Sequence, residues 1–148
     1  MRNAAAAIML LSSGLAVSGV FSIAWERAPA WRAEDSATFR RGITHTLGRV
    51  DKLQPALFIF CLVSSVAFAI VAGGRGAVLS GVGAGCVLAV LAISGLREVP
   101  IQKRLMDPGL RLSDQDVSQM RARWLGGHQV RTGFALAAFA LFVSAALA

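Results

Sequence analysis

The chain has 148 residues, of which 55% are hydrophobic and only 16% are charged. A soluble domain of this size could not cover so much apolar surface with so few charged side chains, so the composition excludes an ordinary soluble globular protein. The formal net charge of +7 does not call for a nucleic acid, because anionic lipid headgroups are sufficient partners for a basic membrane protein.

Four apolar segments account for the hydrophobic excess. Each has about the 17–22 residues that an α-helix needs to cross roughly 30 Å of hydrocarbon. We therefore predict an all-α protein, a four-transmembrane-helix bundle that forms a single domain over residues 1–148. The first segment is longer than the apolar core of a signal peptide, which favours an uncleaved span. The segments cover about residues 4–25, 56–72, 77–96 and 132–148.

The basic residues are distributed unevenly, and their distribution predicts the topology. Of the 15 Lys and Arg side chains, all but Arg2 and Arg75 lie in two long connections, residues 26–55 and 97–131. Cytoplasmic loops of membrane proteins carry an excess of Lys and Arg. We therefore expect a multi-pass protein of the cytoplasmic membrane, with both basic loops in the cytoplasm and both termini on the extracytoplasmic side.

The two connections differ in the local structure that they predict. Residues 36–52 have the composition of a polar loop, too short for a core of its own. In the second connection, Asp107-Pro108-Gly109 is typical of a turn. Ser113 follows as a helix N-cap, with acidic side chains in the first turn. From about residue 114 we expect one helix to continue to the C-terminus, so the last span is extended at its N-terminal end.

Glycines mark one turn and one possible contact between spans. The Gly-Gly-Arg-Gly run at residues 73–76 is a short turn that makes the second and third spans antiparallel neighbours. Gly81 and Gly85 form a GxxxG pair, a spacing that lets helix backbones approach closely in lipid. The alternative is that glycine is simply common in this chain, which has 15 of them.

Three residues that are costly at a membrane boundary share one face of the last helix. Spacings of four and three place Trp124, His128 and Arg131 on the same face. The turns that follow consist mainly of Ala, Leu, Phe and Val, so this face lies where the chain enters the membrane. Placing polar and ionisable groups at this depth costs free energy, because they lose contact with water. They are therefore the strongest candidates for a functional site.

Acidic residues at the ends of the other spans predict a polar layer at the cytoplasmic end of the bundle. Glu26 ends the first span, Asp51 opens the second and Glu98 ends the third. With His128, these carboxylates resemble the inward-facing ligand sets of metal-binding helix bundles. The Glu-x-x-His spacing that places two ligands on one helix is missing, however. We therefore predict no metal, and keep a site of Glu26, Asp51, Glu98 and His128 as an alternative.

The other chemistry that suits this layer is acid–base catalysis on an aromatic substrate. Trp124 offers a face for stacking, and His128 titrates near neutral pH and can take a proton. Arg131 keeps its charge and can hold a developing phenolate or enolate oxygen. Each residue also has a structural alternative. Trp124 could anchor the helix at the interface, and His128 could bond a carboxylate. Arg131 could reach headgroups or pair with Glu98 or Glu26.

The last motif, Trp-x-x-x-His-x-x-Arg-Thr running into an apolar span, is similar to that of the anthrone oxygenase-like small membrane proteins, also known as domain of unknown function 1772. The similarity covers essentially the whole chain, because three further segments match proline-containing segments of the family pattern. The family pattern has Asn before the Val-Pro step and an Asn pair after it, where this chain has Glu98 and Gln102-Lys103. The matching segments are Ala28-Pro29-Ala30, Arg49 through Pro55, and Val99-Pro100.

The resemblance implies a membrane-bound oxygenase that converts an anthrone-type or related aromatic polyketide to a quinone with O₂, without an organic cofactor. In that reaction we expect His128 to act as the base, with Arg131 stabilising the oxyanion and Trp124 forming a stacking wall. Glu98 or Glu26 would orient His128. The sequence contains no dinucleotide fingerprint and no haem-attachment motif.

Two functional classes compete with an oxygenase. One is a non-catalytic membrane subunit that binds lipid or a partner helix through its basic loops. The other is the metal-dependent membrane site described above. The expected partners are membrane lipids and, for an enzyme, a small aromatic substrate. A homo-oligomer is compatible with the sequence.

Overall fold

The computed structural model describes residues 1–50 and 53–148, and every regular element in these ranges is helical. Two of the elements, η1 and η2, are single π-helical turns in which the backbone hydrogen bonds span five residues instead of four. In chain order the elements are α1 (Arg2–Ser22), η1 (Ile23–Arg27), α2 (Ala28–Ala33), α3 (Ser36–Val50), α4 (Leu53–Ala72), α5 (Gly74–Ile93), η2 (Ser94–Glu98), α6 (Val99–Met106) and α7 (Asp114–Leu147).

Four stretches of helix are long and apolar enough to cross a membrane, which confirms the predicted all-α membrane fold. The first and third are longer than the apolar segments in the sequence, because η1 and α2 continue α1, and η2 and α6 continue α5. These extensions carry the acidic ends of both spans into an ordered helical half of the molecule. The four stretches are Arg2–Ala33, Leu53–Ala72, Gly74–Met106 and Asp114–Leu147.

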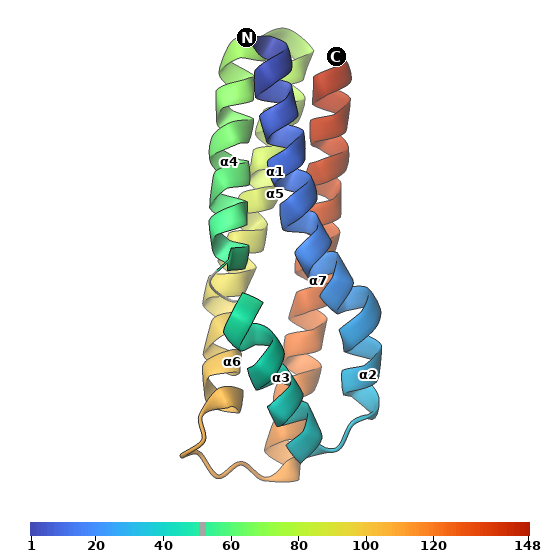
Figure 1. The fold of residues 1–148 in the computed structure, drawn as a ribbon, viewed down its shortest axis with the longest axis vertical. Coiled ribbons are helices and arrows are strands. Elements are labelled where there is room, and N and C mark those ends of the chain that lie inside the picture. Colours follow the sequence, from blue (N-terminus) through green and yellow to red (C-terminus); the bar gives the residue numbers. More distant parts are fainter. Residues whose placement is uncertain (51–52) are drawn as a thin grey trace.

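The four long helices form a closed ring. The main contacts join α1 to α4, α4 to α5, α5 to α7 and α7 back to α1. Both chain ends lie at the same end of the bundle, beside the α4–α5 turn (Figure 1). That turn uses Gly73 and Gly74 at φ +64° and +47°, a left-handed conformation that glycine adopts without steric cost. Which side of the membrane this end faces stays a prediction.

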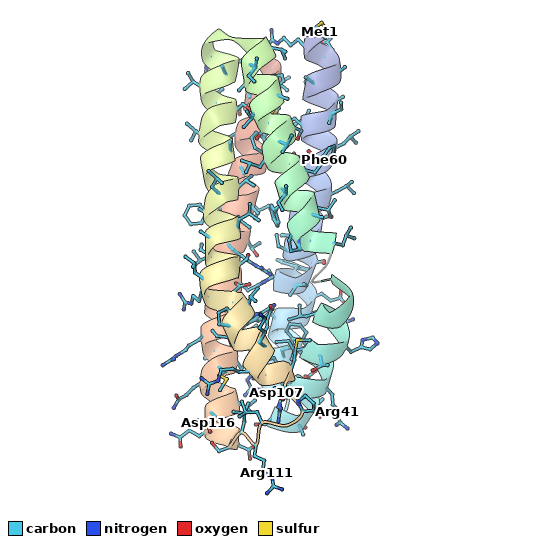
Figure 2. The ribbon with its side chains drawn as sticks, turned by 90° about the vertical axis from the view of Figure 1, so that its left-hand side faces the viewer. Met1, Arg41, Phe60, Asp107, Arg111 and Asp116 are labelled. Atoms are coloured by element: carbon cyan, nitrogen blue, oxygen red, sulfur yellow. The ribbon has the colours of Figure 1, made fainter. Side chains whose placement is uncertain are left out.

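The half of the bundle that holds the chain ends has an apolar core and an apolar surface. Ile59, Phe60 and Val63 on α4 are about half exposed, and Phe60 points away from the bundle (Figure 2). Side chains of this kind belong against lipid, as expected for membrane-spanning segments. The buried core of this half includes Met9, Val20, Phe58, Phe68, Val87 and Phe142.

The opposite half has a second core and a charged surface. α2, α3 and α6 surround the first part of α7 there, and the labelled side chains of Arg41, Asp107, Arg111 and Asp116 all lie at this end (Figures 1 and 2). The molecule therefore divides along its length into a lipid-compatible half and a polar half. The second core contains Trp31, Phe39, Ile43, Leu47, Leu105, Val117 and Trp124.

The prediction of a polar loop over residues 36–52 is wrong for the described part of that segment, which forms α3. Phe39, Ile43 and Leu47 lie four residues apart and are buried against the second core. Arg40 also donates to the backbone carbonyls of Leu105 (2.9 Å) and Asp107 (2.7 Å), so it ties α3 to the end of α6. A helix whose stripe has only three large apolar residues depends on this tertiary packing for its stability.

Side-chain hydrogen bonds define where two helices of the polar half begin. Thr38 donates from its backbone N–H (2.9 Å) and its hydroxyl (2.8 Å) to the Asp35 carboxylate, which holds the pKa of Asp35 below its usual value. At the start of α7, the Ser113 hydroxyl accepts from the Asp116 N–H, and the Asp116 carboxylate accepts from the Ser113 N–H. This reciprocal capping box confirms the predicted N-cap.

Gly83 allows close packing of α5 on α7, and the expected Gly81–Gly85 pair does not form this contact. A Cβ atom on Gly83 would lie 2.5 Å from Cε1 of Phe142, whereas one on Gly81 or Gly85 would meet nothing within 4 Å. The absence of a side chain at Gly83 therefore makes room for the buried Phe142 ring.

We expect Gly83→Ala to destabilise the bundle by about 1–3 kcal/mol, because the Phe142 ring must move from its packed position. The measurement is thermal unfolding in detergent, followed by circular dichroism. Gly81→Ala is the matched control on the same helix, and it should unfold at the wild-type temperature. Equal unfolding temperatures for the two variants would contradict the packing described here.

Candidate functional site

Each π-helical turn is followed by a proline. Pro29 comes after η1 and Pro100 comes after η2, each as the second residue of the next α-helix. Proline has no N–H to donate and its ring disrupts the regular hydrogen-bond ladder of a helix. A wider turn shifts that ladder by one residue and lets the helix continue past the proline. Turns of this kind are frequent at functional sites.

The two π turns lie next to a polar cluster centred on Arg131 of α7. The Arg131 Nη1 atom is 2.8 Å from Glu98 Oε2, and it also donates to the Ser94 hydroxyl at 2.9 Å. Ser94 and Glu98 are the first and last residues of η2. Glu98 is fully buried and Arg131 nearly so, which makes this a buried ion pair. The charge on each partner compensates for the desolvation of the other.

Arg131 also determines the protonation of His128. Its Nε and Nη2 atoms lie 3.2 and 2.9 Å from the His128 Nδ1 atom. A guanidinium can only donate, so Nδ1 must accept and carries no proton. The other ring nitrogen, Nε2, lies 3.0 Å from the Val20 carbonyl oxygen, to which it donates. His128 is therefore a neutral imidazole with its proton on Nε2, held between α1 and Arg131.

Aromatic rings fix the position of His128 from its other side. The Trp124 ring stacks on the imidazole, with centroids 5.0 Å apart and an angle of 17° between the planes. Trp31 of α2 packs its edge against Trp124, and Phe39 of α3 packs against Trp31. Trp124 is fully buried, and within the described residues its indole N–H has no hydrogen-bond partner. It contacts protein rings instead of lying at a lipid interface.

A cavity of about 700 Å³ lies beside this cluster. Its volume falls in the range of about 300–1,000 Å³ that is usual for small-molecule sites. Arg131 and Ser94 form part of its wall, whereas His128, Glu98 and Trp124 lie behind the wall and do not line it. The exposed residues Pro55 and Gly95 also line the cavity, so it reaches the surface between α4 and η2. The apolar part of the wall includes Val20, Ile23, Phe58 and Leu91.

The structure brings together three of the residues that the sequence placed in a polar layer, and it leaves Glu26 outside. Glu98, His128 and Arg131 form one connected cluster. The Glu26 side chain is 70% exposed, and its nearest cation is Arg27 at 3.9 Å. Asp51, the remaining acid of that layer, lies outside the described residues.

The alternative metal site is not assembled among the residues that the structure describes. No group of three or more His, Cys, Asp or Glu side chains lies close enough together there to hold a metal ion. Glu98 faces Arg131, and both nitrogens of His128 are engaged by Arg131 and Val20. A salt bridge and hydrogen bonds therefore occupy Glu98 and His128, which are two of the four ligands in this alternative.

Several residues of the site could not be identified from the sequence. Ser94 stands in an apolar segment and belongs to no motif. Val20 takes part through its backbone carbonyl, which does not depend on the side chain. Gln54 and Gln102 line the cavity as well, although neither belongs to a recognisable motif. A sequence signal that could have located these residues is the pair of prolines Pro29 and Pro100, because each follows a π turn. Thr132 of the last motif donates to the His128 carbonyl at 2.7 Å, which is a bond within α7.

Comparison with known proteins identifies the family. The model of the family described as anthrone oxygenase matches residues 44–141. The chain belongs to the anthrone oxygenase family. The matched region includes Glu98, His128 and Arg131, and it excludes α1, which supplies the Val20 carbonyl that accepts from His128. Searches of the curated proteins and of the solved structures found no match.

Gly127 makes the close approach of Glu98 to α7 possible. A Cβ atom on Gly127 would lie 3.2 Å from Glu98 Oε1 and 3.5 Å from Arg97 Nε, whereas one on the neighbouring Gly126 would meet nothing within 4 Å. We expect Gly127→Ala to push the Glu98 carboxylate from its place and to destabilise the protein by about 1–3 kcal/mol. Gly126→Ala is the matched control and should unfold at the wild-type temperature in detergent. A Gly127→Ala variant as stable as this control would show that Glu98 is not tightly held.

Proposed function

We propose that the cavity beside Arg131 binds an anthrone-type aromatic polyketide, and that the protein oxygenates it to a quinone with O₂ and without an organic cofactor. Membership of the anthrone oxygenase family supports the reaction class. The observation that carries the proposal is a largely apolar cavity of about 700 Å³ whose wall includes the Arg131 guanidinium. A flat apolar ligand with a carbonyl oxygen matches this combination of surfaces.

The chemistry needs little more than a base and a partner for an oxyanion. Loss of a proton from the central methylene of an anthrone leaves an anion whose charge is largely on the carbonyl oxygen. The anion passes one electron to O₂, and the resulting radical pair combines to a peroxide that takes up a proton. Loss of water then leaves the quinone carbonyl. One oxygen atom of O₂ remains on the ring carbon, and the other leaves as water with both methylene hydrogens.

We assign to Arg131 the contact with the substrate oxygen, because Arg131 is the only cation of the buried cluster that lines the cavity in the described part of the chain. Hydrogen bonds to an oxygen that gains negative charge are strongest in a site that excludes water. Glu98 and Ser94 position the guanidinium through the contacts described above. Trp124 supports His128 in this proposal, and does not stack on the substrate.

His128 is the proposed base. In the structure its Nδ1 atom accepts from Arg131. When Arg131 turns its N–H groups to the substrate oxygen, Nδ1 loses these donors and becomes able to accept a proton. Binding of the substrate would thus make the base available. The proton would travel past Arg131, since His128 does not itself line the cavity.

His128→Gln tests this role, because a Gln side chain can also accept from Arg131 and donate to the Val20 carbonyl but cannot act as a base near neutral pH. We expect turnover to fall by about 10²–10⁴-fold while the unfolding temperature changes little. The assay follows anthraquinone formation and O₂ consumption after anthrone is added to purified protein in nanodiscs. Spontaneous oxidation with empty nanodiscs is subtracted.

The activities of two His128 variants show whether His128 acts as a base or only positions Arg131. Full activity of His128→Gln, together with loss of activity in His128→Ala, would mean that His128 only holds Arg131. Wild-type protein that oxidises neither anthrone nor hydroxylated anthrones faster than empty nanodiscs would overturn the proposed function. A non-catalytic membrane subunit would then be the better description.

A further inference from the structure

The charges that the described residues place around the cavity balance one another. Arg131 lines the cavity, but the Glu98 carboxylate lies 2.8 Å behind it. The other charged residues of the wall are Lys103 and Asp107, which are both exposed and have opposite formal charges. Among the described residues, the wall and the acid directly behind it therefore carry no net charge.

The remaining polar groups of the wall are neutral. Gln102 of α6 is only 4% exposed, and within the described part of the chain its side-chain amide makes no hydrogen bond. An amide both donates and accepts, so it can bond a hydroxyl or a carbonyl without charge compensation. Gln54 donates to the Ala16 carbonyl at 2.6 Å, and Ser94 donates to the Val90 carbonyl at 2.7 Å.

A ligand in the cavity thus meets a dipole and not a bare cation. Arg131 is the end of the ion pair that faces the cavity, and Glu98 is the end that faces away. Such a dipole attracts a polarised carbonyl or phenol oxygen. The Arg131–Glu98 dipole compensates poorly for the desolvation of a ligand carboxylate. Glu98 repels the negative charge of such a ligand across a medium of low dielectric constant.

We propose that Glu98 makes this cavity selective for aromatic ligands that are uncharged when they bind. Glu98 is a specificity-determining residue in this view, since it acts by neutralising Arg131 and does not contact the ligand. The inference rests on the proposed function insofar as the cavity is taken as the substrate site. It concerns binding alone, and it makes the preferred substrate a neutral polyphenol or ketone instead of an aromatic carboxylate.

Two fluorescent probes with the same ring system and different charge test the proposal. They are 9-anthracenemethanol and 9-anthracenecarboxylate, titrated into full-length protein in phosphatidylcholine nanodiscs at neutral pH, with empty nanodiscs as the blank. Wild-type protein should bind the alcohol about tenfold more tightly than the carboxylate. Glu98→Gln should increase the affinity for the carboxylate relative to that for the alcohol by about tenfold.

Glu26→Gln is the matched control. It makes the same change in the other π turn and alters the net charge equally, but Glu26 is exposed and lies outside the cavity wall. Its ratio of the two affinities should equal that of the wild type. An equal shift in both variants would overturn the proposal, because the effect would then come from the overall charge. An unchanged ratio in Glu98→Gln would overturn it as well.

A second variant keeps the test decisive if Glu98→Gln does not fold. Lys103→Gln leaves Asp107 as the only charged side chain at the exposed part of the wall among the described residues, so the affinity for the carboxylate should fall by about threefold relative to the alcohol. An unchanged ratio would contradict control of binding by charge.

Because neither probe is an anthrone, these results do not depend on turnover. Charge selectivity without oxygenation would overturn the proposed function alone, and oxygenation without selectivity would overturn this inference alone.

Discussion

The buried ion pair between Arg131 and Glu98 determines the arrangement of the whole site. At 2.8 Å, each charge compensates for the desolvation of the other, which neither could sustain alone in a membrane-spanning bundle. The pair fixes the guanidinium, and the guanidinium then leaves His128 Nδ1 only the role of acceptor. His128 consequently donates from Nε2 to the Val20 carbonyl of α1. The ion pair between η2 and α7 thus sets the protonation of the His128 ring, which is also held by the hydrogen bond to α1.

The π turns explain how ordinary helices present groups to this pair. A regular helix uses its carbonyls internally, whereas a π turn shifts the ladder by one residue and alters which side chains face inward. Ser94 and Glu98 lie at the two ends of η2, and Val20 precedes η1 by one turn of helix. Both turns are followed by a proline, so the irregular backbone follows from the sequence and is repeated on two helices of the ring.

Much of the fold could be predicted, because lipid imposes simple requirements on a sequence. Segments of sufficient length and apolarity predicted the four spans, and Ser113 with its acidic neighbours predicted the start of α7. α3 was missed because its stripe of Phe39, Ile43 and Leu47 is narrow and its other residues are polar, so its stability depends on packing that the sequence does not show. The sequence could not show that Gly83, and not the Gly81–Gly85 pair beside it, makes the close contact, since this depends on the position of Phe142.

The clustering of the candidate residues was predicted better than the individual contacts between them. Trp124, His128, Arg131 and Glu98 are all in one cluster, as their positions at helix ends indicated. Their spacing could not show that Glu98 would pair with Arg131 while Glu26 stays exposed, because that choice depends on how α5 and α1 rotate about their axes. Nor could it reveal the Val20 carbonyl, since backbone groups carry no sequence signal.

The order of the helices has a consequence for how the protein is made. The ribosome synthesises α1 and η2 before α7, so Glu98 is made before the Arg131 cation with which it pairs. A chain that stops before α7 lacks both the cation that lies 2.8 Å from the Glu98 carboxylate and the ring that bonds α1. Completion of the last helix therefore joins the first and third spans in one step. A truncated chain would therefore present the Glu98 carboxylate in the membrane without this ion pair.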